Sequence, residues 1–173
     1  MYKICIMGSG PERFSDHAKV RRVIGQTIDH LGYQYQDVVF HVRGEIGTGL
    51  WAAQECLEQG YRYHLFLPYG PAETCKHWYD DQQKDLIEQY NNAYSLTICK
   101  PQDDGDGGES ESHKRPIDDA NFVVCFWHGE KAGETADAIR YAFSRNKIVL
   151  DGFNDLRLIT NKDLRKTKTW KKD

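Results

Sequence analysis

The sequence predicts an α/β protein built on one doubly wound, mainly parallel sheet with helices on both faces. Short apolar runs alternate with amphipathic stretches along most of the 173 residues. The apolar runs are nearly continuous, which is typical of strands that are buried on both faces. A chain of this length is enough for one ordinary domain, so we expect a single domain over 1–160 and a basic tail over 161–173.

The elements follow in order from these two signals. After the first strand, "YKICIM", apolar residues recur at helical spacing through "HAKVRRVIGQTIDHLG", and Gly32 marks the end of that helix. Gly60 ends the second helix, and Pro68 ends the third strand. We expect strands at 2–7, 37–42, 63–68, 94–99, 121–127, 147–151 and 156–160, with helices at 17–32, 49–60, 80–93 and 134–145.

One segment lacks apolar residues altogether. "KPQDDGDGGESESHKRP" (100–116) is acidic and rich in glycine and serine, so it buries too little apolar surface to fold alone. The strand after it is needed to complete the sheet. We therefore predict that residues 102–112 form a mobile surface loop within the domain.

Composition excludes several classes of protein. The formal net charge is −3, which argues against binding duplex nucleic acid through a broad basic face. No apolar run approaches the ~20 residues that cross a bilayer, and the first residues do not resemble a signal peptide, so we expect no membrane association. The five cysteines are scattered without a C-x-x-C pair, which favours a reduced, cytoplasmic location without a disulfide framework.

Three predicted strand ends carry glycine and a hydroxyl side chain at the start of the next helix. In doubly wound folds, ligands bind beyond the carboxyl ends of strands, where free N–H groups at helix starts hold anions. A glycine turn or a threonine N-terminal cap also explains each loop alone. Three such loops at one edge favour a site for a phosphate-bearing ligand. Their residues are Gly8, Ser9 and Gly10; Arg43, Gly44, Glu45, Gly47 and Thr48; and Gly133, Glu134 and Thr135.

Other side chains near these loops are candidates for contact with the ligand. The ring of Trp51 or Trp127 is suited to stacking on a base, although a single tryptophan more often packs in a core or its rim. Arg115 precedes the fifth strand and could swing over the ligand or face solvent. Asp137 and Glu134 are the candidate acids. The histidines show no metal-ligand spacing, so we expect no metal ion and no required cofactor.

Three stretches together resemble the SLOG superfamily, and within it the YpsA-like branch, which is related to the LOG and DprA proteins. They are "GEIGTGLWAAQECLEQGYRYHLFLPYG", "KHWYDDQQKDL" and "KRPIDDANFVVCFWHGEKAGETADAIRYAF". The resemblance covers roughly residues 3–151 and implies a Rossmann-like nucleotide-binding fold, often paired as a homodimer or higher homo-oligomer. Other branches bind or sense NAD-derived nucleotides, including signals in antiphage defence.

The family's site residues carry over to matching positions in this chain. Arg43 stands where the family usually has the first glycine of its phosphate loop, and Glu134 separates a Gly-Thr pair that is usually adjacent. The corresponding positions are Gly8, Ser9 and Gly10 for the first loop, 43–48 for the phosphate loop, Arg115 for the arginine before the fifth strand, and Gly133, Glu134 and Thr135 for the late helix start.

Three functions remain open from the sequence, the last of them a nucleotide-controlled interaction protein that binds a partner and catalyses no reaction. The first is a sensor or sequestering protein that binds a phosphorylated nucleotide of the ADP-ribose or NAD-derived kind. The second is a nucleotide N-glycosidase (phosphoribohydrolase) or nucleoside transferase that uses Asp137 or Glu134 with Arg115. LOG enzymes carry an arginine and a glutamate after Gly-Thr, and here Asp137 is the nearest acid.

Overall fold

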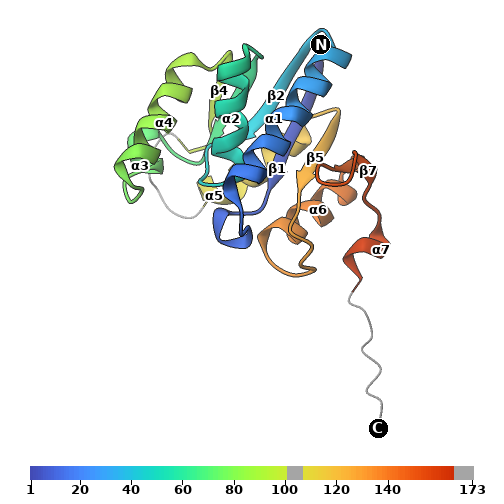
Figure 1. Ribbon diagram of the computed structural model, residues 1–173. Coiled ribbons are helices and arrows are strands. Elements are labelled where there is room, and N and C mark those ends of the chain that lie inside the picture. Colours follow the sequence, from blue (N-terminus) through green and yellow to red (C-terminus); the bar gives the residue numbers. More distant parts are fainter. Residues whose placement is uncertain (101–106, 166–173) are drawn as a thin grey trace.

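A computed structural model describes residues 1–100 and 107–165 (Figure 1). Within these residues the strands form one seven-stranded sheet in the order β4-β3-β2-β1-β5-β6-β7. All neighbouring strands are parallel except β6 and β7. The strands are β1 (Tyr2–Gly8), β2 (Val38–Arg43), β3 (Tyr63–Leu67), β4 (Ser95–Ile98), β5 (Phe122–Phe126), β6 (Val149–Asp151) and β7 (Arg157–Leu158). The doubly wound, mainly parallel fold predicted from the sequence is confirmed.

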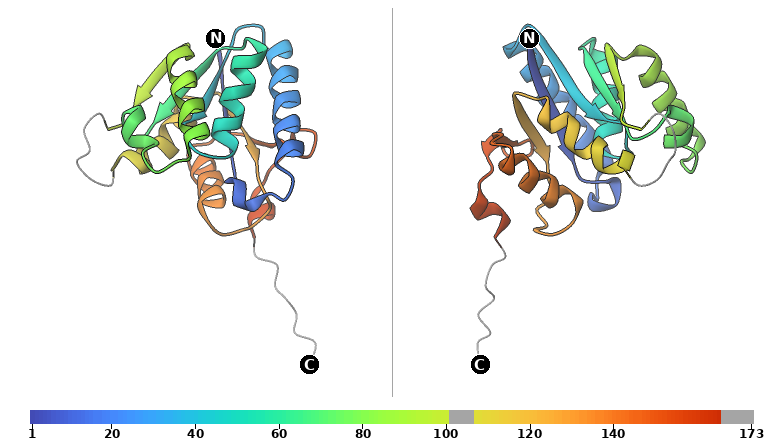
Figure 2. Two further views of the ribbon diagram at one scale, coloured as in Figure 1. Left: turned by 60° about the vertical axis from the view of Figure 1, so that its left-hand side comes forward. Right: turned by 180° about the vertical axis from the view of Figure 1, so that it is seen from behind.

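Helices cover both faces of this sheet (Figure 2). The core on one face includes α1, α2 and α4, and the core on the other includes α5 and α6. Between β1 and η1 the chain turns sharply at the edge where the parallel strands end. The helices are η1 (Pro11–Arg13), α1 (His17–Gln34), α2 (Thr48–Gln59), α3 (Pro71–Thr74), α4 (Asp80–Asn92), α5 (Gly107–Asp118), α6 (Glu134–Ser144) and α7 (Asn161–Leu164).

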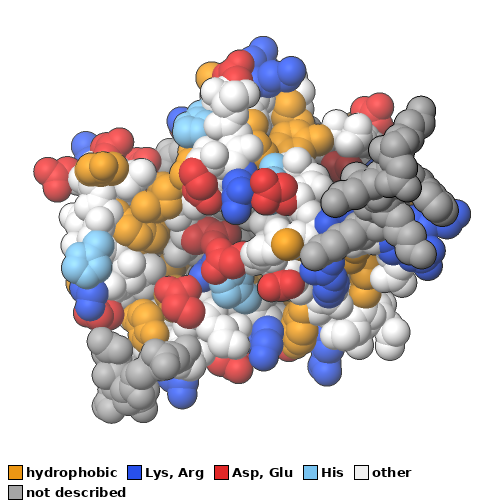
Figure 3. All heavy atoms as spheres, turned by 90° about the horizontal axis from the view of Figure 1, so that it is seen from below, with side chains coloured by type: hydrophobic (Ala, Val, Ile, Leu, Met, Phe, Trp, Pro, Cys, Tyr) orange, Lys and Arg blue, Asp and Glu red, His pale blue; other side chains and the backbone are white. Residues whose placement is uncertain are grey.

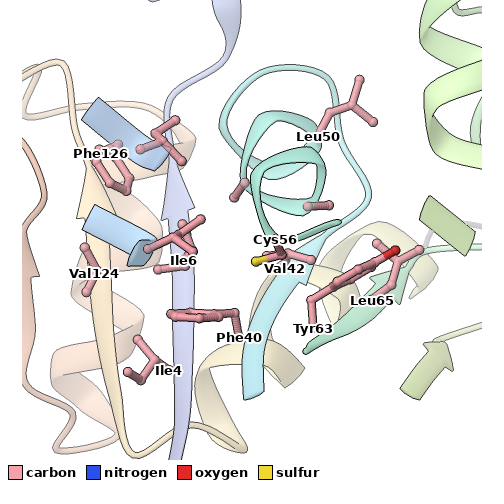
Figure 4. Packing of buried hydrophobic residues seen from close by; sticks show 14 of the residues in the cluster. Ile4, Ile6, Phe40, Val42, Leu50, Cys56, Tyr63, Leu65, Val124 and Phe126 are labelled. Carbon is pink, nitrogen blue, oxygen red and sulfur yellow. The ribbon is translucent and has the colours of Figure 1, made fainter. Parts of the chain in front are cut away.

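Alternate side chains of the central strands pack into the two cores on opposite faces of the sheet. On β1, Ile4 and Ile6 pack into the larger core, shown in Figure 4, while Cys5 packs with α5 and α6 on the opposite face. Val124 and Val123 divide in the same way on β5. Successive side chains of a strand point to opposite faces, so a central strand covered on both faces reads as a continuous apolar run.

The predicted mobile loop is wrong for residues 107–112, because they form the first half of α5. Gly108 and Ser112 are buried there. A Cβ atom on Gly108 would lie 2.4 Å from the carbonyl oxygen of Pro68, so only glycine allows this helix start to approach the end of β3. The polar composition of the segment concealed a helix that buries small residues and, further on, Pro116 and Ile117. Residues 102–106 of the predicted loop lie outside the described residues.

The basic tail also begins later than predicted. Residues 161–164 form α7, and Leu164 packs into the core beside α6 with 6% of its surface exposed. Thr160 caps this helix together with Asp163, whose carboxylate accepts the backbone N–H of Thr160 at 2.8 Å. The ordered core therefore continues past residue 160, and residues 166–173 lie outside the described residues.

Acid should weaken the fold through His41, which is 3% exposed between β2 and α5. Burial lowers its pKa to about 4, and its Nδ1–H donates to the carbonyl of Pro116 at 3.2 Å. The pKa of His41 in the folded state lies below its ordinary value of about 6.5. The contribution of neutral His41 to the free energy of unfolding is therefore complete above about pH 6.5 and is lost towards pH 4, by about 3 kcal/mol in all. We expect the unfolding free energy from urea titrations to fall less steeply between pH 7 and 4.5 in His41→Phe than in the wild type. Equal slopes would contradict this account.

Candidate ligand-binding site

A cavity of about 390 Å³ lies at the carboxyl ends of β1 and β2, between them and helices α5 and α6. We call this cavity the pocket. Figure 3 shows the face of the molecule at these strand ends, with acidic side chains gathered around its middle. The volume is within the range of small-molecule sites, and the position is the one expected for a ligand of a doubly wound fold. The charged and polar side chains that line it are those of Glu12, Arg43, Glu45, Ser112, His113, Glu134 and Thr135.

The start of α6 borders the pocket without a side-chain cap. Gly133 is the N-cap residue at φ 102°, and it provides no side chain to cap the backbone N–H groups of the first turn. The first backbone bond of the helix runs from the N–H of Asp137 to the carbonyl of Gly133, at 3.0 Å. The N–H groups of residues 134–136 therefore lie at the positive end of the helix dipole without an intrahelical partner. Of these residues, Glu134 and Thr135 line the pocket, whereas Ala136 is buried. A smaller cavity of about 80 Å³ over this turn shares Gly10 with the pocket and adds Arg13 and His128 to the site.

Ser9 joins the loops that follow β1 and β5. It is 1% exposed, and its hydroxyl bonds to Nδ1 of His128, accepts the backbone N–H of His128 at 3.3 Å and lies 3.4 Å from Oγ1 of Thr135. Nε2 of His128 lies 3.5 Å from Glu130, which pairs with Arg13 at 3.0 Å. The buried side chain of Ser9 therefore links the loop after β1 to the loop after β5 and to the first turn of α6. Sequence reasoning did not select His128, although its place directly after β5 was the available signal.

The glycines after β2 serve packing between loops. Oγ1 of Thr48 donates to the carbonyl of Ser9 at 2.9 Å and is fully buried, so it braces the loop after β1 and does not cap α2. Gly47 adopts φ 102°, and a Cβ atom there would lie 2.9 Å from Cδ of Pro11. A Cβ atom on Gly44 would lie 2.2 Å from Leu67. The structure thus places Gly44, Gly47 and Thr48 behind the pocket, and Arg43 and Glu45 in its wall.

Arg43 is already bonded on three sides. Its Nε donates to Oγ of Ser112 at 2.9 Å, its Nη1 to Glu45 and its Nη2 to Glu109, and 12% of its side chain is exposed. Burial raises the pKa of Glu45, and the charge of Arg43 opposes that shift. Two carboxylates therefore neutralise this guanidinium, and a phosphate would have to displace one of them.

The rest of the pocket wall favours hydrogen-bond donors in the ligand. Burial and the charge of Arg43 lower the pKa of His113 to about 4, so it is neutral at pH 7. Glu12, Glu45 and Glu134 line the same space. Carboxylates accept hydrogen bonds from hydroxyl and amino groups, so this wall suits the sugar or base of a nucleotide better than a second anion.

Four of the predicted contact residues lie away from the pocket. Trp51 packs beside Phe14 and His17, with ring centroids 6.3 and 5.2 Å away, and Nε1 of Trp127 donates to the carbonyl of Glu130 at 2.8 Å. Two charged residues complete this group: Arg115 is exposed on α5 near Cys99, and Asp137 is 75% exposed and pairs with Arg140 at 3.3 Å.

The described residues show neither a cluster of metal ligands nor a membrane-spanning helix. Among residues 1–100 and 107–165, no three His, Cys, Asp or Glu side chains converge so as to hold a metal ion. In the same residues, no helix combines the length and the apolar character needed to cross a membrane. Neither observation adds a ligand to the pocket.

No protein-family model and no curated protein matches this sequence. Solved structures do. DNA processing protein A (DprA) from Streptococcus pneumoniae is 14% identical with a TM-score of 0.63, and the alignment covers 89% of this chain and 53% of that one. DprA from Helicobacter pylori is 15% identical, with a TM-score of 0.60 over 90% and 71%. The molybdenum cofactor binding protein from Rippkaea orientalis is 16% identical, with a TM-score of 0.55 over 87% and 75%.

At 14–16% identity these likenesses establish the fold alone. The chain spans about half the length of the S. pneumoniae protein. The Rossmann-like fold implied by the SLOG resemblance is confirmed, whereas the neighbours do not single out the YpsA-like branch.

The exclusion of nucleic acid as a partner is wrong. It rested on the net charge of the whole chain, yet the H. pylori protein of the same fold is described by its single-stranded DNA binding mode. Net charge averages over every surface and is silent about a local binding groove. For this chain itself the likenesses establish the fold.

Proposed function

We propose that this protein binds a small phosphorylated nucleotide of the ADP-ribose or NAD-derived kind at the carboxyl ends of β1, β2 and β5. The phosphate would sit over the uncapped first turn of α6, where Glu134 and Thr135 line one small cavity together with Gly10. Arg13 and His128 border the same small cavity, as do the acidic side chains of Glu12 and Glu134, and Arg13 already pairs with Glu130 at 3.0 Å, so the backbone N–H groups are the donors on which the proposal rests. The uncapped start of α6 in the lining of the pocket is the observation that carries the proposal.

The nucleoside would occupy the pocket itself. Its hydroxyl groups would donate to carboxylates such as Glu12 and Glu45, and the apolar part of the wall, including Met7 and Ile46, would contact the base or sugar. The R. orientalis neighbour is named for binding the molybdenum cofactor, which supports small-ligand binding on this fold. Titration calorimetry with AMP, ADP-ribose, NAD and the molybdenum cofactor tests the proposal. Absence of heat for all four at ~mM concentration would overturn it.

Binding is better supported than turnover. The N-glycosidase hypothesis needs Arg115 on the phosphate and an acid beside the sugar. Arg115 lies exposed on α5, and Asp137 points its carboxylate towards Arg140 outside the pocket. Glu134 borders the pocket but is 84% exposed, so it lacks the enclosure that tunes a catalytic carboxylate.

Replacing Glu134 separates the two hypotheses. Because its carboxylate lies beside the proposed phosphate position, we expect Glu134→Gln to lower the dissociation constant of AMP about two- to threefold, a small gain since solvent screens an exposed charge. Calorimetry measures this change, and Glu88→Gln on α4 is the matched control, with no change expected. Chromatography of the incubated nucleotide provides the opposing test: release of free base by the wild type that disappears in Glu134→Gln would favour the N-glycosidase.

A further inference from the structure

A second cavity of about 230 Å³ lies between α5 and α6, and we call it the groove. His113, Ile117, Glu134 and Ala138 line both the groove and the pocket, so the two spaces are adjacent. Glu134 also borders the small cavity over the start of α6. The proposed phosphate position therefore lies where the pocket and the groove meet.

The groove has the walls of a site for a second ligand unit. Ile117 and Ala138 supply an apolar floor, and the ring of Tyr141 lies beyond them. That ring is held in place because its hydroxyl donates to both carboxylate oxygens of Asp118, at 2.7 and 2.8 Å. A fixed aromatic ring beside an apolar floor is suited to contact with a sugar or a flat ring.

Polar groups at the rim of the groove complement a second phosphate or a polyol. Nζ of Lys114 lies 5.8 Å from the centroid of the Tyr141 ring, at the end of a long flexible side chain that reaches over the groove. Ser110 and Asp137 add a hydroxyl and a carboxylate at the same rim. A lysine serves phosphate as a movable point charge, so it need not be preorganised in the free protein.

We infer that the protein takes a ligand of two units joined by a diphosphate, with one unit in the pocket and the other in the groove. The linker would cross the start of α6 between them. This inference rests on the proposed function and deepens it by assigning the second unit of an ADP-ribose-type ligand to the groove. A mononucleotide would fill the pocket and leave the groove empty.

The test compares AMP with ADP-ribose on the full chain by calorimetry. We expect ADP-ribose to bind the wild type at least tenfold more tightly than AMP. Ser110→Trp places a large ring in the groove from an exposed position on α5, outside the pocket wall. It should remove most of that tenfold preference and leave the affinity for AMP unchanged, whereas Ser110→Ala, which removes only one rim hydroxyl, should weaken ADP-ribose by no more than about twofold and also leave AMP unchanged.

A substitution of Lys114 tests the groove independently of Ser110→Trp. Lys114→Ala should weaken ADP-ribose about three- to fivefold and spare AMP, because Lys114 lines the groove and does not line the pocket. Equal affinities of AMP and ADP-ribose for the wild type would overturn the inference and leave the proposed function standing, as would equal weakening of both ligands by Ser110→Trp. Absence of binding by either nucleotide would overturn both.

Discussion

Replacing Thr135 with aspartate should weaken the binding of AMP about 100-fold. Thr135 is the second residue of α6 and lines both the pocket and the small cavity over the helix start. An aspartate there would place a carboxylate at the N–H groups proposed to hold the phosphate, and repulsion between two anions about 5 Å apart costs about 3 kcal/mol in a partly screened site. Titration calorimetry on the wild type and the variant measures the difference.

The fold should tolerate this change, because a negative side chain in the first turn favours the helix dipole. Thr135→Ser is the matched control: it keeps the hydroxyl that lies 3.4 Å from Oγ of Ser9 and should bind AMP within about twofold of the wild type. Unchanged AMP affinity in the folded Thr135→Asp variant would show that the phosphate does not bind at α6.

Replacing Gly8 with valine should lower the free energy of unfolding by about 3 kcal/mol. Gly8 ends β1 where the strand passes between β5 and α2. A Cβ atom at this position would lie 2.6 Å from the carbonyl oxygen of Phe126 and 2.6 Å from Oγ1 of Thr48. The carbonyl oxygen of Phe126 belongs to the backbone, so this clash can be relieved only if β1 and β5 move apart. That movement strains the hydrogen bond from the N–H of Ser9 to the carbonyl of Phe126.

Denaturation with urea, followed by circular dichroism, measures this loss. Gly70→Ala is the control, because a Cβ atom on Gly70 meets nothing within 4 Å and its φ is −54°. We expect that change to alter stability by less than about 0.5 kcal/mol. If Gly8→Val were as stable as Gly70→Ala, the close approach of the strand ends could not be what requires glycine at position 8.

The strands of the sheet could be predicted because their signals lie within short stretches of the sequence. β1 and β5 are buried on both faces, so each reads as a short continuous apolar run, and the turns after them carry glycine. The helix α5 was not predictable in the same way. Its burial depends on Gly108 fitting under Pro68 and on Ser112 meeting Arg43, contacts between segments far apart in the chain. Composition alone favoured a loop there.

In the candidate site, too, local sequence signals could be read and contacts between distant segments could not. The pattern of glycines pointed to the loops at the strand ends but left open whether a threonine caps α6, and the partners of individual side chains could not be predicted. Arg43 stands where the sequence suggested a cation for phosphate, and only the fold brings Glu109 of α5 to its guanidinium. Thr48 was read as a phosphate ligand or a cap, and it instead bonds to the carbonyl of Ser9, 39 residues away. Such pairings depend on tertiary structure.

The central claim is that the free N–H groups at the start of α6 hold the phosphate of a nucleotide. The most direct measurement is an amide ¹H–¹⁵N NMR titration of the full chain with AMP, with the resonances of Gly10 and residues 134–136 assigned. We predict that these amides shift together and saturate at the dissociation constant found by calorimetry. Saturable binding that leaves the amides of residues 134–136 unmoved, or no binding, would contradict the claim.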